Sequence, residues 1–171
     1  MLEKGISVSR SADEWVRYHG KMMVIDREEL HVYGFNYTDN DIRSRSFGVV
    51  TRDRKVVSEA LRLFESDAQR QDFEPSTDGL VVSPENAREE LATFIKRAKK
   101  SLVIYDPKLT DTQMLRLLHL RIKAGVDVRV IGKVGKRGSD LRVQKFPGRR
   151  LHVRAMVRDS DARSEEHTSE L

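Results

Sequence analysis

Apolar residues in the first half of the chain follow the two-residue period of strands and then the longer period of a helix. Apolar stretches predict strands at residues 16–25, 30–36 and 46–51, and the first two form a hairpin around the polar residues 26–29. A weaker alternation predicts another strand at residues 5–10. A helix follows from Asp53 to about Arg70, and its apolar stripe comprises Val56, Val57, Ala60, Leu61, Phe64 and Ala68.

The second half alternates strands with helices. Strands are predicted at residues 80–83, 101–107 and 126–132. One helix starts at Ser83-Pro84, with Ser83 as its N-cap, and a second runs from a cap at Thr110 or Asp111 to Lys123. This order predicts a parallel, right-handed βαβ core. Residues 72–79 gather Pro, Ser, Thr and Gly and are predicted to be a linker between units at 1–71 and 80–162.

Composition and charge limit the classes of protein to consider. The 171 residues contain no cysteine, which excludes disulfides and thiolate metal sites within this chain. No apolar run approaches the roughly 18 residues of a membrane span. The net charge of +5 suits anionic partners such as nucleic acid or lipid headgroups, without choosing between them. Composition leaves the localisation open, with a cytoplasmic or membrane-associated protein as the expectation.

One short pattern occurs twice. It reads His19-x-Lys21-x-x-x-x-Asp26 near the start and His152-x-Arg154-x-x-x-x-Asp159 near the end. Residues two positions apart point to the same side of a strand, so each copy directs an imidazole and a cation to one side. An imidazole can act as nucleophile or acid, and a cation binds phosphate oxygens. The repeat therefore predicts one cleft with two histidines and two cations.

These motifs resemble those of the phospholipase D superfamily, in which the HxKxxxxD pattern is followed by a turn of small residues and an asparagine. Gly34 and Asn36 stand at that turn here, and Tyr33 stands where glycine is usual. The resemblance implies an α/β fold, a phospholipase D-like mixed sheet flanked by helices, with two motif-bearing units that are both incomplete. It also suggests similarity to bacterial cardiolipin synthases and related phosphatidyltransferases.

The resemblance implies roles for the motif residues. His19 is the expected nucleophile that forms a phosphohistidine, and His152 the acid and base, with the reverse assignment open. Lys21, Asn36 and Arg154 are expected to bind the phosphate, and Asp26 and Asp159 to support the motif loops. Relatives often use an acidic residue to orient the histidine, and Ser44 or Ser46 is expected in its place. No metal or other cofactor is expected.

The expected substrate is a phospholipid or another phosphodiester, with peripheral membrane contact. A nuclease of the same superfamily and a non-catalytic domain that binds phosphate or nucleic acid remain alternatives, as does a truncated product without function. The oligomeric state stays open. The basic stretch 133–150 is interpreted as a solvated connection, with lining of the substrate entrance as the alternative.

The remaining notable residues have structural interpretations. His31 and His119 lack the motif and are interpreted as structural or surface histidines, and Trp15 and the Met22–Met23 pair as core residues. Residues 163–171 read RSEEHTSEL, which a common sequencing adapter would encode in one frame. We therefore expect residues 163–171 to lie outside the fold, with a natural polar C-terminus as the alternative. The start is expected to be truncated too, because the first motif has little sequence before it.

Overall fold

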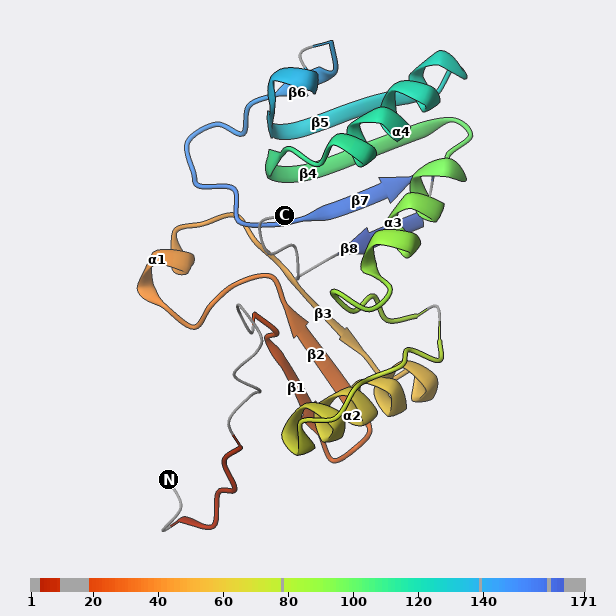
Figure 1. Ribbon diagram of the computed structural model, residues 1–171. Coiled ribbons are helices and arrows are strands. Elements are labelled where there is room, and N and C mark those ends of the chain that lie inside the picture. The colour runs from red at the N-terminus through yellow and green to blue at the C-terminus, as the bar shows by residue number, and fades with distance from the viewer. Residues whose placement is uncertain (1–3, 10–18, 78, 139, 160, 165–171) are drawn as a thin grey trace.

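The computed structural model describes residues 4–9, 19–77, 79–138, 140–159 and 161–164. Within these residues the chain forms two β-sheets with helices packed against them (Figure 1). The first sheet has three strands in the order β1-β2-β3, and the second has five in the order β6-β5-β4-β7-β8. The predicted fold class, a mixed α/β arrangement of sheets flanked by helices, is confirmed.

The first sheet is antiparallel throughout. Its strands are β1 (Met22–Ile25), β2 (Glu29–Tyr33) and β3 (Gly48–Thr51), and the short helix α1 (Asp39–Ile42) lies between the last two. The turn between β1 and β2 contains two residues with positive φ, Asp26 at 51° and Arg27 at 60°. Two such residues in succession match the right-handed twist of a hairpin. The predicted hairpin around residues 26–29 is therefore confirmed.

Helix α2 (Arg54–Gln69) covers one face of the first sheet (Figure 1). Asp53 caps it, as predicted, by accepting hydrogen bonds from the backbone N–H groups of Lys55 and Val56. Its contacts with the small core end at Leu61, so the sheet covers only the first half of the helix. Phe64 was predicted to face the core, but it lies beyond the sheet and is 58% exposed.

The stretch predicted to be a linker packs along α2. The carboxylate of Glu59, whose side chain is only 2% exposed, accepts hydrogen bonds from the backbone and hydroxyl of Ser76 and pairs with Arg62. Phe73 is buried beneath the guanidinium of Arg62. Hydrogen bonds and ring contacts thus hold residues 72–77 against α2. A domain boundary at 72–79 stays a prediction.

The second sheet is mixed. Strands β4 (Ser101–Leu109), β5 (Asp127–Val134) and β6 (Arg142–Gln144) are parallel, and β7 (Ala155–Arg158) and β8 (Asp161–Ser164) are added antiparallel. Helix α4 (Thr112–Lys123) connects β4 to β5, and Asp111 caps it, as predicted. A 3-10 helix, η2 (Lys136–Gly138), lies between β5 and β6. The predicted parallel unit is confirmed for β4, α4 and β5.

The largest core lies between the second sheet and its helices. Helix α3 (Ala87–Lys96) and helix α4 pack together on one face, in front of the sheet in Figure 1. Alternate residues of the central strands, such as Leu102, Ile104 and Val130, face these helices and are at most 1% exposed. Strands β4 and β5 approach closely at Gly132, where a Cβ atom would lie 1.8 Å from the carbonyl oxygen of Asp106. Glycine is therefore required at this position.

Two predicted strands are absent. Residues 5–9 form no strand, and residues 80–83 lead into turns. The predicted helix start at Ser83-Pro84 is also wrong, because Asn86 folds back on the preceding segment. Its Oδ1 accepts from the N–H of Val82 at 2.7 Å, and its Nδ2 donates to the carbonyl of Leu80 at 3.2 Å. Helix α3 therefore begins at Ala87, with Asn86 as its N-cap.

The expectations for the chain ends stay predictions. The backbone of Arg163 and Ser164 forms part of β8 and pairs with β7, which leaves the adapter interpretation of residues 163–171 untested. Trp15 and residues 165–171 lie outside the described residues. Within the part of the chain that the structure describes, every helix is too short or too polar to cross a membrane.

Candidate functional site

A carboxylate from the first half of the chain holds the histidine of the second motif. Nδ1 of His152 lies 2.7 Å from Oδ1 of Asp41, a residue of α1 that is 111 positions away in the sequence. The side chains of Asp41 and His152 are 2% and 17% exposed. A carboxylate at Nδ1 fixes the proton on that nitrogen and leaves Nε2 with its lone pair. The pair thus has the geometry of an oriented imidazole.

Backbone contacts bring the two residues together. The N–H of Arg45 donates to the carbonyl of Arg150 at 2.8 Å, and the N–H of His152 donates to the carbonyl of Arg45 at 3.0 Å. This bridge fixes the chain beyond α1 against the segment that precedes β7. Leu151 and Val153 are buried on the opposite side of that segment. The alternation then turns His152 and Arg154 to a common side, as the sequence predicts.

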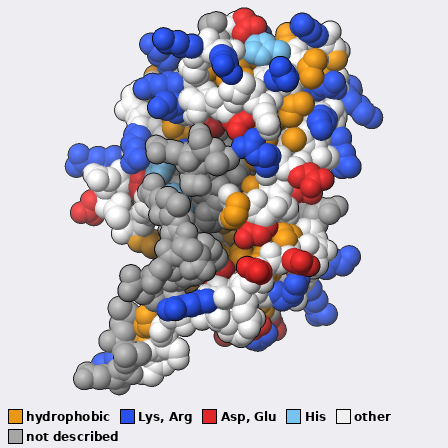
Figure 2. Space-filling model, viewed as in Figure 1, with side chains coloured by type: hydrophobic (Ala, Val, Ile, Leu, Met, Phe, Trp, Pro, Cys, Tyr) orange, Lys and Arg blue, Asp and Glu red, His pale blue; other side chains and the backbone are white. Residues whose placement is uncertain are grey.

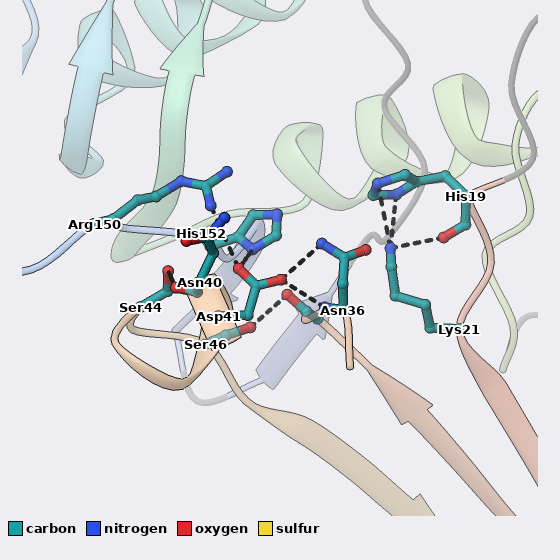
Figure 3. A network of polar contacts seen from close by, with 10 residues as sticks. His19, Lys21, Asn36, Asn40, Asp41, Ser44, Ser46, Arg150 and His152 are labelled. Atoms are coloured by element: carbon teal, nitrogen blue, oxygen red, sulfur yellow. Dashed lines mark hydrogen bonds and ion pairs between the residues drawn. The ribbon is translucent and has the colours of Figure 1, made fainter. Parts of the chain in front are cut away.

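Asp41 is ionised because its oxygens are well supplied with donors. The backbone N–H and the side-chain amide of Asn36 donate to Oδ2 at 2.8 and 2.7 Å, and Arg150 lies 3.4 Å from Oδ1 (Figure 3). Burial would raise the pKa of Asp41. The hydrogen bonds from Asn36 and His152 outweigh burial and lower the pKa to about 2. The carboxylate therefore keeps its negative charge at neutral pH.

Asn36 has a role that sequence reasoning did not anticipate. It was expected to bind the phosphate, whereas its backbone N–H and its side-chain amide both donate to Asp41. Asn36 therefore positions the carboxylate that positions His152. Direct contact between Asn36 and a phosphate stays a prediction.

The first motif is arranged differently. Nζ of Lys21 lies 2.8 Å from Nδ1 and 3.3 Å from Nε2 of His19, and it also donates to the carbonyl of His19. An ammonium beside an imidazole favours the neutral ring. In Figure 3, His19 and Lys21 lie on the other side of Asn36 from His152. Contacts with Asn36 and Asp41 are thus established for the second motif, and the meeting of both motif copies in one cleft stays a prediction.

Arg154 lies near a partly buried carboxyl group, that of Asp106, in the second half of β4. Burial raises the pKa of Asp106, while a hydrogen bond from the backbone N–H of Lys108 and the charge of Arg154 oppose that rise. The bond from Lys108 measures 2.7 Å. Arg154 therefore sits where the carboxyl end of a parallel strand meets the segment carrying His152, a common location for binding sites.

The two motif aspartates differ in their contacts. The carboxylate of Asp159 accepts hydrogen bonds from the backbone N–H groups of Lys99, Lys100 and Ser101, at 3.2, 2.8 and 2.9 Å. These contacts join the end of β7 to the start of β4, and the support role of Asp159 in the site stays a prediction. Asp26 is exposed in the β1–β2 turn and makes no side-chain hydrogen bond to the residues that the structure describes.

The predicted serine substitution is wrong. The hydroxyl of Ser44 donates to the carbonyl of Asn40, and that of Ser46 donates to the carbonyl of Gly34. Neither contacts a histidine, because both hydroxyls are engaged by local backbone. Asp41 takes the orienting role instead. The signal for it was an acidic residue five positions after Asn36, although Asp39 gave an equal signal, and only the fold separates the two.

A hollow and a basic surface accompany these residues. The hollow has a volume of about 470 Å³ and is lined by Phe35, Asn36, Tyr37, Thr38, Asp39, Asp41, Ile42, Ser44 and Ser46. Lys and Arg side chains gather on the part of the molecule that carries β4, β5 and β6 (Figure 2). Among the described residues, no group of three or more histidine, aspartate or glutamate side chains could hold a metal ion.

Comparisons with known proteins support the fold. No family model and no curated protein sequence matches this chain. A solved structure that resembles it is the crystal structure of polyphosphate kinase from Porphyromonas gingivalis, with a TM-score of 0.71 and 18% sequence identity. The likeness covers 91% of this chain, which spans only 30% of the polyphosphate kinase chain.

This finding corrects the family interpretation. The similarity to cardiolipin synthases and phosphatidyltransferases, inferred from the two motifs, is wrong, because the structural likeness leads to a polyphosphate kinase. At 18% identity the likeness shows the fold alone. The chain therefore has a mixed α/β fold that it shares with a polyphosphate kinase.

Proposed function

We propose that this chain carries a phosphoryl-transfer site that works through a phosphohistidine intermediate. The observation that supports this most strongly is the 2.7 Å contact between Asp41 and Nδ1 of His152. A buried carboxylate at Nδ1 orients Nε2 and stabilises the imidazolium that forms when Nε2 takes a proton. Such an arrangement is typical of histidines that act in group transfer.

The electrostatics favour distinct roles for the two histidines. Lys21 lies against the ring of His19, which suits a neutral nucleophile, while Asp41 at Nδ1 orients Nε2 of His152 for proton transfer. A ring nitrogen of His19 attacks phosphorus, and the bond between phosphorus and the leaving oxygen breaks as His152 gives that oxygen a proton. Water or an alcohol then attacks, His152 takes its proton, and the nitrogen–phosphorus bond breaks. Lys21 and Arg154 neutralise the phosphoryl oxygens in both steps.

Two substrate classes fit this chemistry. The motifs favour a phosphodiester, and the structural likeness to a polyphosphate kinase favours a phosphoanhydride such as inorganic polyphosphate. The hollow beside Asp41 would seat the group attached to the phosphate. A nuclease remains the second candidate, because the chain carries a net charge of +5 and exposed cations along β5 and β6.

The test compares substrates and histidine variants in the same protein. The substrates are bis(p-nitrophenyl) phosphate, radiolabelled inorganic polyphosphate and plasmid DNA. Turnover and covalent label that survives alkali but not acid are measured for the wild type, His19→Asn and His152→Asn. The matched control is His119→Asn, because His119 also lies 2.7 Å from an aspartate, Asp140, but outside the candidate site.

Both motif variants should lose at least about 100-fold in turnover, and the control should retain it. If His19 is the nucleophile, His19→Asn abolishes the covalent label, whereas His152→Asn retains slow labelling by the activated ester. The opposite pattern reverses the roles. Phosphate binding without turnover in the wild type would favour the non-catalytic interpretation, and equal activity in all three variants would contradict the proposal.

A further inference from the structure

A second set of hydrogen-bonded side chains lies on β2, on the face of the first sheet that α2 does not cover. Glu29, His31 and Tyr33 occupy alternate positions of the strand, so their side chains share one face. Nε2 of His31 lies 2.7 Å from Oε1 of Glu29, and the hydroxyl of Tyr33 lies 2.9 Å from Nδ1 of His31. The phosphoryl-transfer site described above does not use these three residues.

The acidic end of this set is anchored. Oε2 of Glu29 accepts a hydrogen bond from the guanidinium of Arg52 at 2.7 Å. Hydrogen bonds from His31 and Arg52 lower the pKa of Glu29, so its carboxylate is ionised at neutral pH. The carboxylate accepts the Nε2 proton of His31. Nδ1 of the neutral ring then carries the lone pair, and the hydroxyl of Tyr33 donates its proton to it.

The neighbours of this set are known from the strand register. His31 lies between Met23 of β1 and Val50 of β3, which are both apolar. Tyr33 lies between Lys21, whose carbonyl accepts from the N–H of Tyr33, and Gly48. The charged groups that face the set from adjacent strands are therefore Lys21 and Arg52, and both are cations.

The ring of Tyr33 is held in place by packing. A Cβ atom on Gly48 would lie 2.8 Å from Cδ1 of Tyr33, so the ring rests directly over this glycine. The rings of Phe35 and Tyr37 pack against it from the other side, with centroids 5.1 and 5.7 Å away. The side chains of Glu29 and His31 are 22% and 18% exposed. The hydroxyl is thus held against its base in a partly solvated position.

We propose that Tyr33 is the nucleophile of a second reactive site, activated by Glu29 and His31, that accepts a phosphoryl group from an activated phosphoryl donor. Nucleophile, base and orienting carboxylate are each within hydrogen-bond reach of the next. In the step, Oη of Tyr33 bonds to phosphorus and the bond from phosphorus to the leaving group breaks. The phenolic proton passes to Nδ1 of His31 and then to the leaving group or solvent.

The test uses a fluorophosphonate as the activated donor, which releases fluoride when an oxygen attacks its phosphorus. Labelled positions are located by peptide mass spectrometry on the full chain, and labelling rates are followed over time. Tyr37 and Tyr105 serve as internal references, because neither hydroxyl contacts a histidine in the hydrogen bonds of the described residues. Tyr33 should be labelled at least about 10-fold faster than either reference.

Variants separate activation from simple exposure. His31→Phe keeps an aromatic ring beside Tyr33 but removes the base, and it should lower labelling of Tyr33 to the rate of Tyr105. Glu29→Gln keeps a hydrogen-bond acceptor for His31 without the charge, and it should lower labelling about 3-fold or more. Gly48→Ala displaces the ring and should also lower it. Circular dichroism confirms that each variant is folded.

The pH profile gives an independent readout. Labelling of Tyr33 in the wild type should fall as the solution is acidified and His31 gains a proton, because a protonated ring cannot accept one from the phenol. In His31→Phe the step that an imidazole contributes to this profile should disappear, which leaves only the dependence on the phenol itself. Equal labelling of the three tyrosines in the wild type would overturn the proposal. Rates for Tyr33 that are unchanged in both His31→Phe and Glu29→Gln would overturn it as well.

Discussion

The two copies of the motif share the same pattern of histidine, cation and aspartate but differ in how the fold supports them. In the second copy, His152 is bound to a buried carboxylate from the first half of the chain, and Asp159 is bound to three backbone N–H groups. In the first copy, His19 contacts its own Lys21, and Asp26 lies exposed in a turn. The second copy contains β7, which has a neighbouring strand on each side. The first copy contains β1, which lies at the edge of its sheet.

This difference shows that a motif defines the chemistry of its side chains but not their support. Asp41 lies five residues beyond Asn36, which follows the first motif, and yet it orients the histidine of the second motif. The two halves of the chain therefore depend on each other at the site. Variants that remove support should affect the second copy far more than the first.

The largest effect is expected from Asp41→Asn. The substitution keeps the size of the side chain but removes the charge that stabilises a protonated His152, so turnover should fall by about 10²- to 10³-fold. Steady-state kinetics with the best substrate from the panel above provide the measurement. Asp140→Asn is the matched control, because Asp140 makes an equally short contact with His119, and it should retain full turnover. Equal losses in both variants would mean that Asp41 acts through general stability.

A smaller effect is expected from the motif aspartates. Both have φ angles near 50°, and asparagine tolerates this conformation, so Asp159→Asn and Asp26→Asn form a matched pair. Asp159→Asn weakens the bonds to three N–H groups and should lower the Tm by about 3 °C. Asp26→Asn removes no hydrogen bond to a described residue and should change the Tm by less than about 1 °C. Thermal unfolding followed by circular dichroism measures both, and similar shifts would erase the contrast between the copies.

The contribution of Asp41 to stability should depend on pH. Its pKa is about 2 in the folded chain and 3.8 ordinarily, so the ionised form stabilises the folded state on the order of 2 kcal/mol above about pH 4. That contribution is lost as the pH falls from about 4 through 2. Urea unfolding should therefore show wild type more stable than Asp41→Asn at pH 6, with the difference closing by pH 2. A difference that stays constant with pH would show that the charge of Asp41 is not responsible.

Local sequence signals predicted the regular parts of this fold. The apolar periods located α2, β4, α4 and β5. Asp53 was identified as the start of α2, and Asp111 was one of two candidate caps for α4. These features depend on residues within one turn or one strand. The predicted strand at residues 80–83 failed because Asn86 draws that segment into turns, which no apolar pattern encodes.

The motif pairs predicted which imidazoles and cations point to a common side within each copy, and their meeting in one cleft stays a prediction. The partner of His152 could not be predicted, because Asp41 contacts it across 111 positions through the bridge between Arg45 and Leu151. Ser44 and Ser46 were chosen from their place in the sequence, and both bind local backbone instead. Contacts at long sequence distance depend on the tertiary fold and carry little local signal.

The central claim is that the carboxylate of Asp41 fixes the proton of His152 on Nδ1. Long-range ¹H–¹⁵N correlation spectra of the histidine side chains test it directly, with His152→Asn used to assign the signal. At neutral pH the wild type should show His152 with its proton on Nδ1, or on both nitrogens, and Asp41→Asn should move the neutral ring toward the Nε2–H form that is commoner in free imidazoles. A His152 with its proton on Nε2 alone in the wild type, unchanged in Asp41→Asn, would contradict the account.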